Sequence, residues 1–235
     1  RNALSRAMLH ALRAVLAGLR AEAGAVRAVV VQGAGPAFCA GHDLRELAGS
    51  VPADHATLFS ECAEVMAALP ALPQATIAAV HGPALAAGCQ LVAACDLAVA
   101  HAAAEFATPG VHIGLFCATP AVALTRCVGR RAALDMLLTG RRVGAAEALR
   151  MGLVSRVVEE CPQTAAAELA RTIAGASGAA LATGKRAFHA QEAAGSLVDA
   201  YGVASEAMVE GLRTHDAQEG IAAFLERRRP EWRHL

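Results

Sequence analysis

Apolar residues recur along the chain with two spacings, one typical of helices and one typical of buried strands. Residues 4–19 place apolar side chains at helical spacing, and residues 27–32 form a short, mainly apolar run closed by glycines. This order predicts an amphipathic helix followed by a buried strand. Residues 53–68 and 75–80 repeat the helix and the strand, with Pro73 between them. The chain therefore starts as a series of helix–strand units.

These units continue to about residue 160, and only helical spacing follows. After the last apolar run the pattern is helical and ends in the charged residues 226–230. We therefore predict an α/β core with a parallel sheet over residues 1–175 and a helical region over residues 176–235, packed on this core or on a neighbouring subunit. The remaining strands are expected at 97–100 and 154–158, and the remaining helices at 89–94, from about 119, and at 132–138. A further turn of the chain runs through residues 105–107 to the break at Pro109-Gly110.

Composition allows a large core and removes several classes of partner. More than half of the 235 residues are hydrophobic, which suits one large α/β domain. The 21 basic and 21 acidic residues cancel, so no overall charge favours a nucleic-acid or acidic-membrane partner. Every apolar run is interrupted well before the ~20 residues that a membrane-spanning helix needs.

Cysteine and histidine spacing supports neither a disulfide framework nor a metal site. The seven cysteines include no CxxC pair, and none of the nine histidines lies in an HExxH pattern. A reducing interior is expected, either the cytoplasm or, in a eukaryote, the mitochondrial matrix. The chain opens at Arg1 without an initiator Met or a signal pattern, so we expect a leading segment with N-terminal strands of the core to precede it.

Two loops carry the candidate chemistry. Residues 37–44 follow the first strand and residues 81–90 follow the second, and both are rich in small residues that let a ligand approach the backbone. The second loop leads into a helix, whose free N–H groups and dipole favour negative charge. Two such N–H groups would form an oxyanion hole. On spacing alone, however, tight packing is the better explanation for the small residues.

An oxyanion hole becomes the better explanation of these loops because a series of motifs resembles those of the enoyl-CoA hydratase/isomerase (crotonase) family. The match is ordered and spans nearly the whole chain, and residues 41–44 and 88–92 are most similar to the subgroup called enoyl-CoA hydratase domain-containing proteins. The motifs are Asn2-Ala3-Leu4, Phe38-Cys39-Ala40-Gly41-His42-Asp43-Leu44, Ala86-Ala87-Gly88-Cys89-Gln90-Leu91, Cys95-Asp96-Leu97, Phe106-Ala107-Thr108-Pro109, Leu138-Thr139-Gly140 and the closing helix 219–228.

The resemblance implies a fold and a ligand. The fold is a spiral of ββα turns with a C-terminal helical region that joins subunits as a homotrimer or a dimer of trimers. The ligand or substrate is an acyl-coenzyme A thioester, with no other cofactor, no metal, no nucleic acid and no membrane partner.

The resemblance also implies a site. The thioester oxygen would lie between the N–H groups of His42 and Ala87, or Gly88 if the motif is shifted by one residue. The two glutamates that hydratases of this family use fall at Gln90 and Gly110. The coenzyme A moiety would contact Ala40, Gly41, His42, Asp43 and Leu44.

Neither glutamate position holds an acid. Gln90 has nearly the shape of Glu but cannot accept a proton near neutral pH, and Gly110 offers only backbone, in a place suited to φ > 0. Other branches of the family carry the acid further on, but residues 115–119 contain no carboxylate. Since acid–base assistance is worth roughly 10²–10⁴ in rate, we expect little ordinary hydration. The alternatives are a decarboxylase or thioesterase of this fold, or a non-catalytic acyl-CoA-binding or assembly protein.

A few other groups lie near these motifs. His112 is expected to face away from the ligand or to bind a carbonyl, and Cys117 to be an inert buried thiol. The His42 ring is the best spare acid–base group near the thioester. The Gly33-Ala34-Gly35 turn is not a dinucleotide fingerprint, because Phe38 occupies the third glycine position. Four arginines suit either the coenzyme A phosphates or an ordinary surface: Arg1, Arg45, Arg227 and Arg228.

Overall fold

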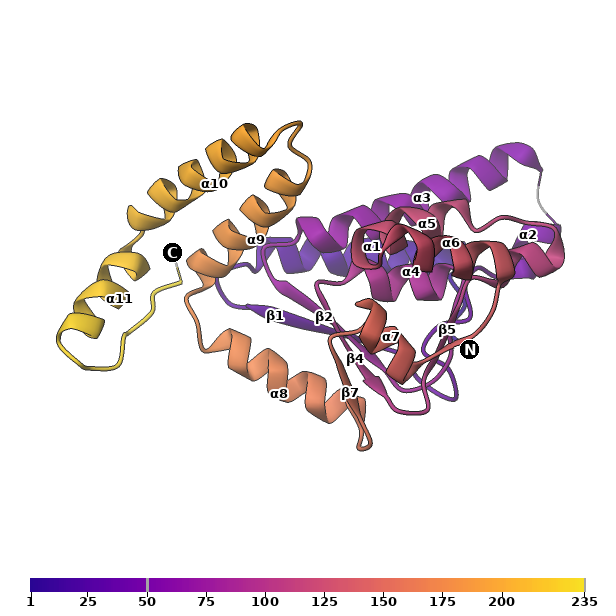
Figure 1. Ribbon diagram of the computed structural model, residues 1–235, viewed down its shortest axis with the longest axis horizontal. Coiled ribbons are helices and arrows are strands. Elements are labelled where there is room, and N and C mark those ends of the chain that lie inside the picture. Colours follow the sequence, from indigo (N-terminus) through magenta and orange to yellow (C-terminus); the bar gives the residue numbers. More distant parts are fainter. Residues whose placement is uncertain (50, 235) are drawn as a thin grey trace.

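A four-stranded parallel sheet forms the centre of the molecule (Figure 1). The computed structural model describes residues 1–49 and 51–234. The strands lie in the order β1 (Ala28–Gln32), β2 (Ala75–Val80), β4 (Leu97–His101) and β7 (Arg156–Val158). A small second sheet pairs β3 (Ala84–Leu85) with β5 (Glu105–Ala107), and β5 with the antiparallel β6 (Val143–Gly144).

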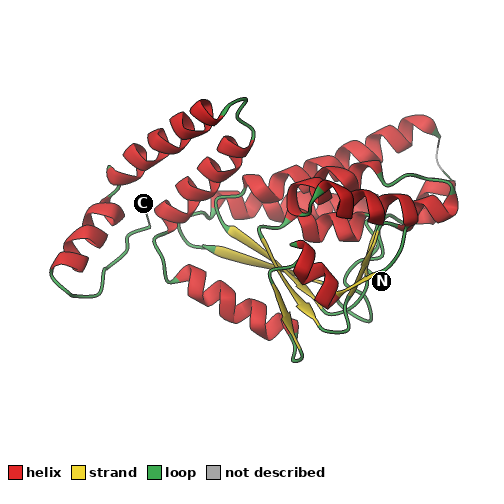
Figure 2. Cartoon of the chain, viewed as in Figure 1, coloured by secondary structure: helices red, strands yellow, loops and turns green. Residues whose placement is uncertain are grey.

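Helices cover both faces of the four-stranded sheet, and the side chains of β2 are buried on both sides. Ile77 and Ala79 pack with α8 (Pro162–Ala174), whereas Ala78 and Val80 belong to the larger core on the opposite face. Successive strand residues point to opposite faces, so a strand buried on both sides is a continuous apolar run. The helices on the larger side are α1 (Arg6–Ala21), α3 (Pro52–Ala71), α4 (Ala87–Ala94), α5 (Ala118–Cys127) and α6 (Arg130–Thr139), as Figure 2 shows in red.

The prediction of an α/β protein with a parallel sheet and a helical C-terminal region is confirmed. The expected strand at 75–80 matches β2 residue for residue, and residues 105–107, expected only as part of a further turn, form β5. One expectation was wrong at a boundary that matters: α4 starts at Ala87, two residues before the predicted helix. Among the residues described, five short elements were not predicted, namely β3, β6, α2 (Leu44–Ala48), the 3₁₀ helix η1 (Pro109–Ile113) and α7 (Ala145–Met151).

The C-terminal helices form an arm that extends away from the sheet (Figure 1). The predicted boundary at residues 175 and 176 falls between α8 and α9 (Gly178–Glu192), and α10 (Leu197–Leu212) and α11 (His215–Leu225) follow. Lys185 anchors α9 to the core, because its Nζ lies 2.7 Å from Asp96 Oδ2 and donates to the carbonyls of Leu69 and Gln74. We call residues 178–225 the helical arm.

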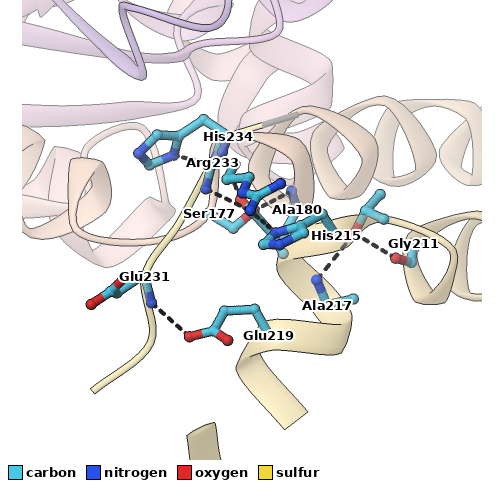
Figure 3. Close-up of polar contacts among 12 residues, drawn as sticks. Ser177, Ala180, Gly211, His215, Ala217, Glu219, Glu231, Arg233 and His234 are labelled. Carbon is cyan, nitrogen blue, oxygen red and sulfur yellow. Dashed lines mark hydrogen bonds and ion pairs between the residues drawn. The ribbon is translucent and has the colours of Figure 1, made fainter. Parts of the chain in front are cut away.

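A buried carboxylate ties the tail back onto this arm. Asp216 is 1 % exposed and accepts hydrogen bonds from Ser177 Oγ at 2.6 Å, from Arg233 N at 2.7 Å and from His234 N at 3.0 Å. Figure 3 shows the tail residues 231–234 lying beside the start of α11, where Glu219 accepts from the Glu231 N–H. The last residues described are thus held by hydrogen bonds to charged groups.

The described residues contain neither a candidate membrane span nor a candidate metal site. No helix within residues 1–49 and 51–234 is both long and apolar enough to cross a membrane. The same residues contain no group of three or more His, Cys, Asp or Glu side chains placed to hold a metal ion.

Candidate functional site

Three loops meet at the amino-terminal end of α4. Leu85 N donates to Cys39 O at 2.9 Å, and Ala86 N donates to Ala107 O at 2.8 Å. The segment before α4 is therefore held between the loop after β1 and the end of β5. The sequence motifs at 38–44, 86–91 and 106–109, far apart along the chain, form one cluster.

Backbone conformation brings two of these loops into contact. Gly41 has φ +92°, and a Cβ there would lie 3.0 Å from both Ala86 Cβ and Leu85 O and 3.5 Å from Ala87 N. Ala86 itself has φ 50° and ψ −117°, a conformation that costs a non-glycine residue roughly 1–3 kcal/mol. His42 N, which directly follows Gly41, therefore lies close to the first N–H of α4.

The N–H groups at this contact have no acceptor among the residues that the structure describes. Within the described ranges, no carbonyl or side chain accepts a hydrogen bond from His42 N or Ala87 N, and the first intrahelical bond of α4 runs from Gln90 N to Ala86 O. Both groups are carried by well-packed segments, since Gly41 and Ala87 are buried. Free N–H groups at a helix start attract negative charge.

Gly88 is fixed by packing. A Cβ on Gly88 would lie 2.8 Å from the carbonyl carbon and from the Cβ of Cys39 and would overlap the Cys39 carbonyl oxygen. Only glycine lets α4 approach the 38–44 loop this closely. The geometry of the two predicted N–H donors thus depends on the absence of a side chain at 88.

Gln90 follows Ala87 by one turn of α4 and is 4 % exposed. Its Oε1 is buried without a hydrogen-bond partner in the described part of the chain. Buried amides are almost always hydrogen-bonded, so this oxygen indicates a water or ligand that the protein atoms do not replace.

Gly110 lies in a 3₁₀ helix, η1 (Pro109–Ile113), and its φ is not positive. The expected φ > 0 was wrong, and the obstacle to a side chain is instead steric. A Cβ on Gly110 would lie 2.8 Å from Cys117 Sγ and would overlap the Leu115 carbonyl oxygen. The proximity of Cys117 to Gly110 was not foreseen from the sequence.

The His42 ring is held away from bulk water. Its Nδ1 lies 3.2 Å from Leu4 O and therefore carries the proton, and the ring packs edge-on against Phe59 of α3 with centroids 5.3 Å apart. Nε2 is buried and has no partner among the residues described. Burial lowers the pKa of His42 and outweighs the opposing hydrogen bond to Leu4, so the neutral ring is favoured.

The structure also places His112 and three of the arginines named from the sequence. His112 Nε2 lies 2.9 Å from Thr139 O, in agreement with the expectation that it binds a carbonyl. Arg1 and Arg45 flank the 38–44 loop, since Arg1 O accepts from Ala40 N and Arg45 is the second residue of α2, directly after the loop. Arg228 is paired with Glu219 and Glu226 beyond α11, away from this cluster in the single chain.

A hollow of about 250 Å³ adjoins the cluster. Its lining residues are Leu85, Ala107, Pro109, His112, Gly140, Arg141 and Arg142. Both arginines are engaged in ion pairs, Arg141 with Asp135 and Glu147, and Arg142 with Glu105. A larger hollow of about 420 Å³ lies in the helical arm, far from these loops.

The parallel sheet, the small second sheet and the two loops that meet before α4 define a protein with the crotonase fold. The chain belongs to the enoyl-CoA hydratase/isomerase family, whose model matches residues 1–234. Over 236 aligned residues it is 49 % identical to the mitochondrial enoyl-CoA hydratase domain-containing protein 3 of Rattus norvegicus, covering 100 % of this chain and 78 % of the relative. The predicted family and subgroup are therefore confirmed.

Solved structures agree with this assignment. The crystal structure of human enoyl Coenzyme A hydratase domain-containing protein 3 superposes with a TM-score of 0.94 at 45 % identity, covering 98 % of this chain and 91 % of that chain. An enoyl-CoA hydratase from Mycobacterium smegmatis gives a TM-score of 0.93 at 46 % identity, covering 98 % and 90 %. The predicted crotonase fold is confirmed.

Proposed function

We propose that the protein binds an acyl-coenzyme A thioester, with the carbonyl oxygen between the N–H groups of His42 and Ala87. The observation that carries the proposal is this pair of N–H groups without acceptors, on segments that Gly41 and Ala86 bring into contact. Gly88 packs against Cys39 and is the less suitable donor. Fixed donors of this kind stabilise the negative charge of an enolate, and one donor is worth ~3 kcal/mol.

The rest of the ligand would extend from this point. Coenzyme A would contact Ala40, Gly41, His42, Asp43 and Leu44, with Arg1 and Arg45 near enough to meet its phosphates. Leu115 and Phe116, which are apolar and about half exposed beside Gly110, suit an acyl chain. The acyl chain would bury this surface, which is favourable at about 25 cal/mol per Å².

The proposed ligand does not imply ordinary hydration. Gln90 and Gly110 take the positions of the family's two glutamates, so no carboxylate is available to deprotonate water or to protonate the α-carbon. Gln90 can orient a water through its amide, but it cannot accept a proton. We therefore propose that acyl-CoA binding is retained and that crotonyl-CoA hydration is slower than in a glutamate-bearing hydratase by roughly 10²–10⁴.

Hydration of crotonyl-CoA and calorimetric binding of a saturated acyl-CoA test this proposal together. Gln90→Glu should raise the hydration rate without tightening binding, whereas Gln218→Glu, an exposed change on α11, should do neither. Fast hydration by the unmodified protein, lost in His42→Ala but kept in Gln90→Ala, would show that the catalytic groups lie elsewhere. Absence of acyl-CoA binding would remove the proposed site.

A second function is favoured by the same two N–H groups. Decarboxylation of a malonyl-type thioester produces an enolate without a base, so it needs the donors and a proton source only. Incubation with saturated, unsaturated, malonyl-type and aryl acyl-CoAs, followed by mass spectrometry of thioester and acyl chain, separates the possibilities. Binding without turnover across this panel would favour a non-catalytic acyl-CoA-binding or assembly protein.

We also propose that the chain assembles as a homotrimer or a dimer of trimers through the helical arm. The support is its exposed apolar surface, including Tyr201, Met208, Phe224 and Leu225, which are 68–82 % exposed. Large apolar patches of this kind mark association surfaces. If the source is eukaryotic, the mitochondrial relatives support a place in the mitochondrial matrix.

A further inference from the structure

The space beside Gly110 is filled by a thiol. Gly114, at φ +79° after η1, reverses the chain so that Leu115 N donates to Gly110 O at 2.9 Å. The turn brings Cys117 back to the glycine, where its sulfur lies 2.8 Å from the position of a Gly110 Cβ. The first heavy atom of a side chain at 110 would therefore touch this sulfur.

The thiol lies at the same end of the core as the two free N–H groups. Cys117 is the residue before α5, and α5 packs along α4. At the far end of the pair, Cys127 Sγ contacts Ala93 O at 3.1 Å. At the near end, Cys117 lies against Gly110, which follows Ala107 by three residues, and the Ala107 carbonyl accepts from Ala86 N just before α4. The two helices therefore run in the same direction and begin together.

A second observation indicates that something polar belongs between these helix starts. Gln90 is only 4 % exposed, and its Oε1 is buried without a hydrogen-bond partner in the described part of the chain. It lies one turn after Ala87, on the face of α4 that carries the free N–H. His42 Nε2, in the other loop of the site, is likewise buried without a partner among the residues described.

We propose that Cys117 is the proton donor to the α-carbon of a thioester enolate held by His42 N and Ala87 N. The inference rests on the proposed acyl-CoA site and names the substrate class as malonyl-type thioesters. The bond from the α-carbon to the carboxylate breaks and carbon dioxide leaves. The electron pair forms the enolate, and the Cys117 S–H proton then forms the new C–H bond. Water returns a proton to the thiolate, so one proton is consumed per carbon dioxide released.

The chemical state of the thiol suits this step. Burial raises the pKa of Cys117 and outweighs the lowering contact with Gly110 N–H, so the group is protonated near neutral pH. Cys89 is fully buried and burial raises its pKa to about 12, which leaves it inert. Cys117 is only partly buried, so a ligand and water can reach it.

Decarboxylation of 2-methylmalonyl-CoA in heavy water tests the donor. The unmodified protein should place deuterium on the α-carbon in one configuration. Cys117→Ala should still release carbon dioxide but give both configurations in similar amounts, because bulk water then protonates the enolate. Cys117→Ser should restore part of the selectivity, and Cys161→Ser, at an exposed cysteine outside the site, should change nothing.

Two results would overturn the inference: no decarboxylation by the unmodified protein, or a single configuration retained in Cys117→Ala. Calorimetric binding of butyryl-CoA separates these failures from failure of the site. If butyryl-CoA binds while either result is found, the acyl-CoA site stands and the proton-donor role falls. If it does not bind, both fall.

An affinity label tests the position of the sulfur without any variant. Bromoacetyl-CoA carries bromide on its α-carbon, and attack by Cys117 sulfur forms a thioether there, releases bromide with the electron pair and passes the thiol proton to the buffer. After reaction at a pH alkaline enough to ionise this thiol, peptide mass spectrometry should find the label on Cys117, prevented by excess butyryl-CoA. Labelling of Cys161 instead, or labelling that butyryl-CoA does not reduce, would contradict the proposed geometry.

Discussion

Replacing Gly88 by alanine adds one methyl group at the tightest contact of the site. The new Cβ would lie 2.8 Å from the Cys39 carbonyl carbon and Cβ and would overlap the Cys39 carbonyl oxygen. Cys39 cannot retreat, because its carbonyl accepts from Leu85 N at 2.9 Å and its side chain is 2 % exposed. The first turn of α4 must therefore move away from the 38–44 loop.

This displacement has two measurable costs. Overpacking of a dense core destabilises by roughly 1–3 kcal/mol, which corresponds to several degrees in Tm for a chain of this size. Separation of Ala87 N from His42 N removes one neutral hydrogen bond to a bound carbonyl, worth about 0.5–1.5 kcal/mol, or roughly 2- to 10-fold in Kd. Loss of an oxyanion donor costs turnover more, ~3 kcal/mol.

Thermal unfolding and acyl-CoA titration calorimetry measure the two costs separately. Gly18→Ala on α1 is the matched control, because a Cβ there meets no atom within 4 Å, and helix propensity predicts a gain of about 1 kcal/mol. Gly88→Ala should therefore lower Tm and weaken binding while Gly18→Ala raises Tm and leaves binding unchanged. Unchanged acyl-CoA binding in a folded Gly88→Ala protein would refute the assignment of Ala87 N as a donor.

Two further predictions concern the C-terminal half. Burial alone would raise the pKa of Asp216, but bonds from Ser177, Arg233 N and His234 N outweigh it and lower the pKa. The stabilisation that Asp216 provides should therefore be complete above roughly pH 4 and be lost as pH falls through the folded pKa. In urea unfolding, Asp216→Asn should lower the free energy of unfolding by about 2–3 kcal/mol and remove this pH dependence. Light scattering should find a trimer or hexamer, reduced by Phe224→Glu but not by Val15→Glu on α1; a monomeric unmodified protein would contradict the proposed assembly.

The fold was predictable where burial leaves a pattern along the chain. β2 is buried on both faces and appears as an unbroken apolar run, whereas β3 and β6 have two residues each and no period to detect. The start of α4 was missed because Ala87 and Gly88 resemble a loop locally. The bend at Ala86 starts the helix there, and contact with Gly41 accompanies that bend.

The candidate site was predictable to the extent that it lies in the family's motifs. The sequence named positions 42, 87, 90 and 110, and in the structure the loops that carry them lie together. The chemical roles of these residues stay predictions. Two contacts had no sequence signal: Phe59 against the His42 ring, and Cys117 against Gly110. The second depends on Gly114, whose left-handed conformation folds residues 115–117 back over η1.

The two positions without acids are therefore not equivalent. Gln90 already has the volume of a glutamate, and no described protein group donates a hydrogen bond to its Oε1. Gln90→Glu therefore changes the charge without changing the packing. A glutamate at Gly110 would first have to displace Cys117 Sγ and the Leu115 carbonyl. Recovery of hydration from a glutamate pair thus requires a smaller residue at 117 as well as acids at 90 and 110. The thiol that leaves no room for a side chain at 110 is thus the same group that we propose as the proton donor.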